Sequence, residues 1–329
     1  MRLVQFKDLD GSKRVAKVQD DGLQLLEKAN SVYDLVIEAM QTNRNLEAMI
    51  QERLSSRALF DYDKIIADNR LLPPIDHPDP AHLLVSGTGL DHLGSALARD
   101  AMHTNADKEK TMSDSMKMFR MGLEGGKPKS GEVGAQPEWF YKGDGSSIVP
   151  PGQPLELPSF ALDGGEEAEV VGVYVISEAG DVFRVGFTLG NEYSDHILEK
   201  QNYLYLAHSK LRECSMGPEL LVGRLPESVT GRVSVIRGGE TIWSSPFLTG
   251  EANMTHTLSN IEYHHFKYKR FRRPGDVHCH FFGASVLSFS SGIATRPGDI
   301  FEISSPQFGH PLRNPLRKGG AASFTIRDF

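Results

Sequence analysis

The sequence predicts an α+β protein in which a small α/β N-terminal domain precedes a larger, β-rich domain. Two short alternating runs, residues 3–6 and 15–18, flank Asp10-Gly11 and are typical of a β-hairpin. A helical pattern begins after them at Ser31, whose hydroxyl can cap a helix. From residue 137 onward, short apolar runs alternate with Gly and Pro turns, so we expect a β-rich core with few helices there.

A proline-rich connector at residues 72–80 separates the two parts. We therefore expect a small domain over residues 1–75 and the larger domain over residues 76–329. At the start of the larger domain, the apolar run 81–86 predicts a buried strand, and residues 92–102 predict a helix.

Two further segments of the larger domain can be interpreted. Residues 117–136 are rich in Gly, Met and Lys and show no clear period, so we expect either a mobile loop over a site or a disordered surface loop. Residues 259–268 predict a helix that leads into a strand at 277–281.

The composition excludes several classes of partner. The net charge of −7 argues against nucleic acid or an anionic membrane, and the basic run 267–273 is better explained as a solvated helix end before Pro274. Cys214 and Cys279 are too few for a disulfide framework and fit a reducing cytoplasm. No signal peptide is visible, and no apolar run approaches the roughly 20 residues that cross a bilayer. We therefore expect a cytoplasmic protein with no nucleic-acid or membrane partner.

Two carboxylates stand two residues apart at the start of an apolar, β-branched run. On a strand, Glu167 and Glu169 point to the same face. Two negative charges so close together raise the pKa of one of the two carboxyl groups unless a cation lies between them. Mg²⁺ suits this arrangement because it prefers oxygen ligands and few protein carboxylates. A strand with one solvated face explains the spacing equally well, so the pair alone leaves both interpretations open.

The segment 186–195, Gly-Phe-Thr-Leu-Gly-Asn-Glu-Tyr-Ser-Asp, follows this pair by about twenty residues. Together, the pair and this segment resemble the fumarylacetoacetate hydrolase family, which carries Glu-x-Glu on one strand and a third acidic ligand twenty-odd residues later. Turns at 151–158, 297–303 and 311–316 resemble those of the family in the same order.

The resemblance implies a mixed β-roll catalytic domain, a homodimer and a small-molecule 2-keto acid substrate. It also implies that one Mg²⁺ ion is bound, with Mn²⁺ or Ca²⁺ able to substitute. The implied ligands are Glu167, Glu169 and Glu192, with Glu in place of the usual Asp at the third position.

Hydrolases of this family activate water with a His–Glu dyad. The resemblance places the catalytic His at His92, but the position that carries the dyad Glu in some members is Ser95. Other members draw the Glu from a stretch after a Gly-Asp-Val strand start, and here residues 275–277 are followed by 278–285 without an acid. A base that activates water needs an orienting partner. The sequence therefore weakens the hydrolase interpretation.

A dehydratase of a 2-keto-3-deoxy sugar acid needs no activated water, and the run 278–283 also resembles the sugar-acid branch of the family. The resemblance thus favours a Mg-dependent hydro-lyase that converts 2-keto-3-deoxypentonate to 2-oxoglutarate semialdehyde. One alternative is a C–C bond hydrolase of an acylpyruvate or a 2,4-diketo-3-deoxy sugar acid. Another is a non-catalytic sugar-acid binding protein.

Several side chains are candidates for proton transfer and substrate binding. Lys210 resembles the active-site Lys of the family, although another alignment places His208 there, and His92 is the second candidate base. Each candidate also has a plain structural explanation as a surface, turn or helix-start residue. The candidate substrate contacts are Lys142, Ser146, Ser147 and Thr188.

Overall fold

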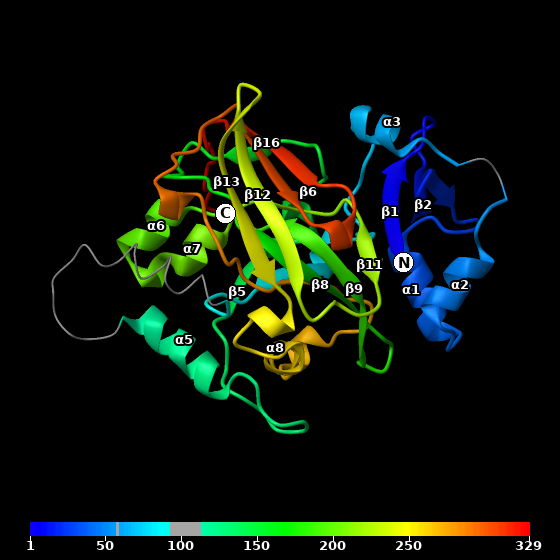
Figure 1. Cartoon of the computed structure of the whole chain (residues 1–329), viewed down its shortest axis with the longest axis horizontal. Coiled ribbons are helices and arrows are strands. Elements are labelled where there is room, and N and C mark those ends of the chain that lie inside the picture. The colour runs from blue at the N-terminus through cyan, green and yellow to red at the C-terminus, as the bar shows by residue number, and fades with distance from the viewer. Residues whose placement is uncertain (57–58, 93–112) are drawn as a thin grey trace.

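Two mixed β-sheets with helices at their edges and faces confirm the predicted α+β class (Figure 1). A computed structural model describes residues 1–56, 59–92 and 113–329. The described helices are α1 (Val32–Gln41), α2 (Leu46–Glu52), α3 (Tyr62–Ala67), α5 (Asp114–Gly125), α6 (His196–Gln201), α7 (Leu206–Lys210) and α8 (Leu258–Phe266). None of them is long and apolar enough to cross a membrane.

The larger sheet contains eleven strands, and its main path runs β3-β2-β1-β11-β9-β8-β14-β4-β5. Strands β6 and β10 join it through β9. Their bounds are β1 (Arg2–Lys7), β2 (Lys13–Gln19), β3 (Gly22–Leu25), β4 (Leu83–Gly87), β5 (Phe140–Asp144), β6 (Ile148–Val149), β8 (Ala168–Ile176), β9 (Val182–Asn191), β10 (Cys214–Met216), β11 (Leu220–Val222) and β14 (Val277–Phe281).

The smaller sheet contains five strands in the order β13-β12-β15-β16-β7. Their bounds are β7 (Leu155–Leu157), β12 (Val229–Arg237), β13 (Glu240–Thr249), β15 (Ile300–Ser304) and β16 (Leu312–Lys318).

Strand β8 lies at the centre of the molecule, covered on both faces. Its residues alternate between two cores: Val171 and Val173 pack with α1 and α2, whereas Val170 packs with β12, β13 and α8. Every residue of β8 is buried, which explains its near-continuous apolar sequence. The strand that carries Glu169 is therefore held firmly from both sides.

The N-terminal strands belong to the same sheet as the rest of the chain. β1 and β2 form the predicted antiparallel hairpin, with Leu3 opposite Lys17. On its other edge β1 pairs with β11, where Leu3 lies opposite Leu220 (Figure 1, blue strands beside β11). The division at residue 75 stays a prediction, since the first strands extend the larger sheet.

Most of the predicted elements are present with small shifts. Ser31 caps α1 by accepting the Asp34 N–H at 3.0 Å, and β4, α8 and β14 cover the runs predicted as strand, helix and strand. The predicted helix 92–102 lies outside the described residues after its first position.

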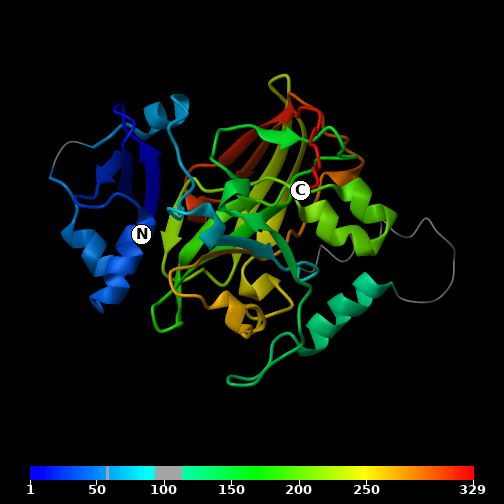
Figure 2. The ribbon, with the colours of Figure 1, turned by 180° about the vertical axis from the view of Figure 1, so that it is seen from behind.

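The prediction of a loop over 117–136 is wrong for its first half, because α5 continues to Gly125. Helix α5 stands away from the sheets (Figure 2). Its buried residues are Ser115, Phe119 and Gly122, and Gly122 lies against Thr255 and His256. The helix is amphipathic but contains few apolar residues, and its glycines and lysines suggested a loop.

Candidate metal centre and active site

Three glutamates meet where two central strands start and end. β8 and β9 are antiparallel, and Ala168 lies opposite Asn191, so the residue before β8 and the residue after β9 are neighbours. The Glu192 N–H donates to the Glu167 carbonyl at 3.0 Å. Glu169 points to the same place as Glu167, as its spacing predicted. One oxygen from each of Glu167, Glu169 and Glu192 lies within 4.8 Å of the others, and all three residues are buried.

The Lys210 ammonium, at the end of α7, lies against two of these carboxylates. Its Nζ donates to Glu167 Oε1 at 2.5 Å, to Glu192 Oε2 at 2.9 Å and to Ser194 Oγ at 3.2 Å. It also lies 5.1 Å from the centre of the Phe140 ring. Lys210, like the carboxylates, is almost completely buried.

Glu169 lacks an equivalent partner. Its Oε2 accepts the Gly283 N–H at 2.7 Å, but its Oε1 is buried and has no hydrogen-bond partner among the described residues. An unpaired carboxylate oxygen in such a place is costly. A divalent cation between the three carboxylates supplies the missing partner, and oxygen-only ligands are the set that Mg²⁺ prefers. The residues present therefore fit a magnesium ion.

The surroundings push the three carboxyl groups in different directions. Burial raises the pKa of Glu167, but the Lys210 ammonium and then His196 outweigh it and hold that pKa well below the usual value. Burial, followed by the negative charges of Glu192 and Glu167, raises the pKa of Glu169 well above the usual value. Burial also raises the pKa of Glu192, although Lys210 opposes it. Such divergent shifts in one small cluster are typical of functional sites.

A small cavity opens onto this cluster. Its volume of about 20 Å³ is enough for one water molecule or one ion. Two of the glutamates and the lysine are its ionisable lining residues among those described. The cavity is lined by Thr88, Gly89, Leu90, Phe140, Glu167, Glu192, Lys210, Gly283, Ala284, Ser285 and Leu287.

His92 is buried in a hydrogen-bonded pair beside this cavity. Its Nδ1 lies 2.8 Å from Asp91 Oδ1, and its Nε2 lies 2.8 Å from Thr249 Oγ1. Neither of the two positions that supply the dyad acid in the family holds one here, but the preceding residue, Asp91, contacts the ring. His92 is not among the lining residues of the cavity, and its catalytic role stays a prediction.

The four predicted substrate contacts lie away from the cavity lining. Lys142 is buried behind the cluster, where its Nζ lies 3.3 Å from Glu192 Oε1 and donates to the Tyr193 carbonyl at 2.8 Å. Thr188 Oγ1 donates to the Glu219 carbonyl at 2.8 Å. The hydroxyls of the other two, Ser146 and Ser147, bond within the turn that follows β5. Their role in substrate binding remains a prediction without support from these positions.

Sequence reasoning missed the loop that forms one wall of the cavity. Residues 283–288 follow β14, and four of them line the cavity. A Gly followed by small residues after a buried strand was the available signal, since such sequences let a backbone approach a ligand closely. Gly283 has a φ of +89°, and a Cβ on it would lie 2.2 Å from Asp91 Oδ1.

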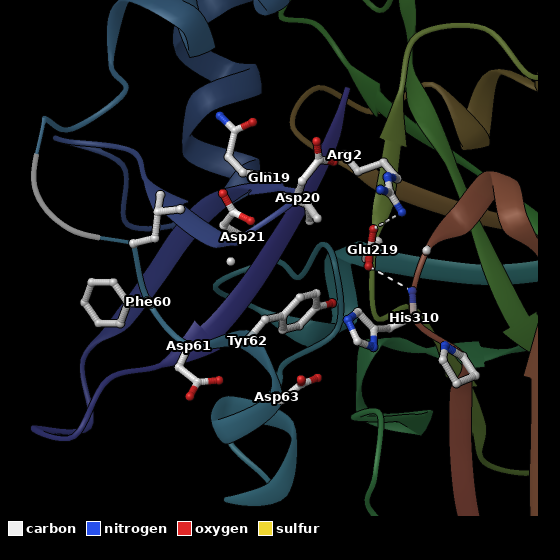
Figure 3. A pocket seen from close by; sticks show the side chains of 15 residues that line it. Arg2, Gln19, Asp20, Asp21, Phe60, Asp61, Tyr62, Asp63, Glu219 and His310 are labelled. Carbon is white, nitrogen blue, oxygen red and sulfur yellow. Dashed lines mark hydrogen bonds and ion pairs between the residues drawn. The ribbon is translucent and has the colours of Figure 1, made fainter.

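A larger cavity of about 720 Å³ lies at the N-terminal side of the molecule, between the β2–β3 turn and the start of α3 (Figure 3). At its inner end the buried Glu219 carboxylate pairs with Arg2 and accepts the His310 N–H (Figure 3). It shares no lining residue with the metal cavity, so it is not part of the candidate active site.

The structure is similar to solved structures of a dehydratase and of an isomerase. It matches the apo form of 2-keto-3-deoxy-D-arabinonate dehydratase with a TM-score of 0.71, at 18% identity, over 97% of this chain and 100% of that chain. The same dehydratase complexed with magnesium and 2,5-dioxopentanoate matches with a TM-score of 0.70, at 18% identity, over 97% and 99%. A 5-carboxymethyl-2-hydroxymuconate delta-isomerase from Mycobacterium smegmatis matches with a TM-score of 0.58, at 18% identity, over 97% and 100%.

This chain has the fumarylacetoacetate hydrolase fold.

The resemblance to the sugar-acid branch of that family is matched by a curated relative as well. A probable 2-keto-3-deoxyxylonate dehydratase of Haloferax volcanii is 29% identical over 121 residues, which are 35% of this chain. The aligned part spans 40% of that relative. No family model matches the chain. Both the relative and the first structural neighbours are dehydratases of 2-keto-3-deoxy sugar acids.

Proposed function

We propose that this protein is a magnesium-dependent dehydratase that converts a 2-keto-3-deoxy sugar acid, a pentonate, into 2,5-dioxopentanoate (2-oxoglutarate semialdehyde) and water. One observation carries the proposal: a buried cluster of Glu167, Glu169 and Glu192 with the Lys210 ammonium against it, at one small cavity. The similarity in fold to an enzyme complexed with magnesium and 2,5-dioxopentanoate supports the choice of reaction.

The three glutamates would hold the magnesium ion, with Mn²⁺ or Ca²⁺ able to substitute. When bound, the ion supplies a Lewis acid that polarises the 2-keto group and makes the C3 hydrogens more acidic. The orphan Oε1 of Glu169 is the atom that most directly requires it.

Lys210 is the residue to which we assign proton transfer. Its Nζ is the one side-chain nitrogen among the described lining residues of the cavity. Magnesium at the carboxylates would replace the positive charge of the Lys210 ammonium there, so that Nζ releases a proton to solvent. In the dehydration, the neutral Nζ then accepts a proton from C3, the C3–C4 double bond forms, and the C4–O bond breaks. The same nitrogen returns a proton to the departing hydroxyl, which leaves as water. The unsaturated product then tautomerises to the aldehyde, so atoms and charges balance without an oxidant.

The deciding experiment is incubation of the purified protein with 2-keto-3-deoxypentonate and Mg²⁺, followed by NMR. The expected result is a 2,5-dioxopentanoate signal that disappears with EDTA and in Lys210→Met. A matched control is Lys64→Met, at an exposed lysine on α3, which should retain activity. Formation of pyruvate and a two-carbon aldehyde would overturn the dehydratase proposal.

The Asp91–His92 pair keeps a C–C bond hydrolase as the second candidate, because an acid-oriented histidine is what water activation requires. Hydrolysis of an acylpyruvate that is lost in Asp91→Asn, together with no dehydration of the pentonate, would favour it. Binding of the pentonate without any turnover would favour a non-catalytic binding protein.

We infer that two copies of the chain associate. Apolar side chains are exposed together around α6 and α7, and Asp195 ties their segments to one another through the Leu162 N–H and the Arg212 guanidinium, each at 2.9 Å. Exposed apolar patches of this kind are typical of protein interfaces. The patch comprises Phe160, Leu162, Ile197, Leu204 and Leu211.

Light scattering after size exclusion tests this association. The expected result is a dimeric wild type and a monomeric Leu204→Glu variant. Leu9→Glu is the control, since Leu9 is equally exposed but lies on the β1–β2 turn. A monomeric wild type, or equal effects of the two substitutions, would contradict the association.

The two free, buried cysteines agree with a cytoplasmic location.

A further inference from the structure

One hydroxyl that lines the cavity at the glutamate cluster lacks a hydrogen-bond partner within the described part of the chain. Ser285 Oγ is shielded from solvent and has no hydrogen-bond partner among the described residues. Ser285 is also a lining residue of the metal cavity. Buried hydroxyls are nearly always hydrogen-bonded, so the contents of the cavity are the natural source of its partner.

Among the described lining residues, no other uncharged side chain is available to form a hydrogen bond with a ligand. Thr88 carries the second hydroxyl of the lining, but its Oγ1 donates to Asp91 Oδ2 at 3.2 Å and lies 3.4 Å from the Phe281 carbonyl. Leu90, Phe140, Ala284 and Leu287 are apolar, and the remaining side chains belong to the charged cluster. Ser285 is therefore the neutral hydrogen-bonding side chain that the described lining offers to a ligand.

Two glutamates fix the position of Ser285 relative to the metal cluster. Glu169 Oε2 accepts the Gly283 N–H at 2.7 Å, at the start of the loop. Glu166 Oε1 accepts the Ser288 N–H at 2.8 Å, and Glu166 Oε2 accepts the Ser288 hydroxyl at 2.7 Å, at the end of the loop. Both glutamates belong to the segment 166–169 at the start of β8, so the loop that carries Ser285 is anchored at both ends to the segment that carries two of the proposed metal ligands. Preorganised polar groups of this kind give a site its specificity.

We propose that Ser285 selects hydroxylated keto acids by hydrogen-bonding the C4 hydroxyl of the substrate, the group that leaves. The inference rests on the proposed dehydratase function. A serine hydroxyl both donates and accepts, so it can orient a neutral alcohol, whereas the cation and Lys210 hold the charged keto-acid end. A site built to bond a hydroxyl discriminates against the analogue that lacks it, because the protein group is then left unpaired.

Paired binding measurements test this assignment. In the presence of Mg²⁺, and in a Lys210→Met background that prevents turnover, the dissociation constants of 2-keto-3-deoxypentonate and of 2-oxopentanoate, the same chain without hydroxyls, are measured by calorimetry with Ser285 intact and with Ser285→Ala. The expected result is a two- to tenfold weaker binding of the pentonate in the variant, the range of one hydrogen bond, with 2-oxopentanoate unchanged. Ser290→Ala, in the exposed turn just after the loop, serves as the matched control and should change neither.

Three results would overturn the assignment. Equal weakening of both ligands would mean that Ser285 contacts the keto-acid end or the ion. No weakening of either ligand, or no preference for the pentonate when Ser285 is intact, would mean that Ser285 does not hydrogen-bond the C4 hydroxyl. Ser285→Thr, which keeps the hydroxyl, should restore the preference if Ser285→Ala loses thermal stability. Because binding is measured without turnover, an inactive wild type refutes the dehydratase function and leaves this test intact.

Discussion

Glu169→Gln is the substitution that most directly tests whether the glutamate cluster holds a metal. The amide oxygen of Gln can still accept the Gly283 N–H, so the one hydrogen bond of Glu169 is retained. The orphan Oε1 position becomes neutral. We therefore expect the metal-free variant to unfold within about 1 kcal/mol of the wild type.

The wild type and Glu169→Gln should differ in how strongly added Mg²⁺ stabilises them. At a free concentration one hundred times the dissociation constant, binding stabilises the wild type by about 2.7 kcal/mol. For 329 residues the unfolding entropy is about 0.7 kcal/mol per kelvin, so Tm should rise by about 4 °C. If the loss of one charged ligand weakens binding about a hundredfold, the same Mg²⁺ stabilises the variant by only about 0.4 kcal/mol, or about 0.6 °C.

Differential scanning calorimetry with and without Mg²⁺ measures both shifts. Glu166→Gln is the matched control: Glu166 is also buried and lies one residue from the cluster, but both its oxygens bond to Ser288. This control should keep the full Mg²⁺ shift. A full shift in Glu169→Gln, or none in the wild type, would refute the metal site.

Three further outcomes are expected. Burial lowers the pKa of His265 to about 4 and holds the pKa values of His278 and His280 well below the usual value. All three side chains are therefore neutral in the folded protein near pH 6. In the unfolded chain the same histidines take up protons below about pH 6.5. Stability should therefore fall as the pH drops from 6.5 towards 4, by about 2 kcal/mol between pH 7 and 5 for His265 alone, and urea unfolding of His265→Gln should show a flatter pH profile. Lys210→Met should lower kcat at least about a hundredfold with Mg²⁺ present, because it removes the proposed proton carrier, and a kcat within a factor of about three of the wild type would exclude that role. Gly283→Ala should lower the free energy of unfolding by about 1–3 kcal/mol and reduce activity, since its φ of +89° disfavours a side chain; an unchanged urea midpoint would show that the loop adapts.

The strands and the glutamate cluster could be anticipated because their signals are local. Period-two alternation revealed β1 and β2, and the spacing of Glu167 and Glu169 placed both carboxylates on one side of a strand. The third carboxylate needed the family resemblance, because it comes from another strand whose register with β8 is set by tertiary packing.

The environment of the other candidates could not be anticipated, because it depends on contacts between distant segments. His92 bonds to Thr249, far along the chain, and Lys142 lies behind Glu192 instead of facing the cavity. No local pattern tells which hydroxyl is satisfied inside the protein. The Thr188 hydroxyl donates to the Glu219 carbonyl, whereas the Ser285 hydroxyl has no hydrogen-bond partner among the described residues.

The pairing of β1 with β11 also gives the first strands a protective role. β11 lies between β1 and β9, and β9 ends next to Glu192. Removal of the residues that precede the proline-rich connector would leave the backbone N–H and C=O groups of β11 unpaired on one side. This open sheet edge would lie one strand away from the active site. Such edges recruit strands from other molecules. By pairing with β11, the N-terminal segment covers this edge and keeps the larger sheet from pairing with a strand of another molecule.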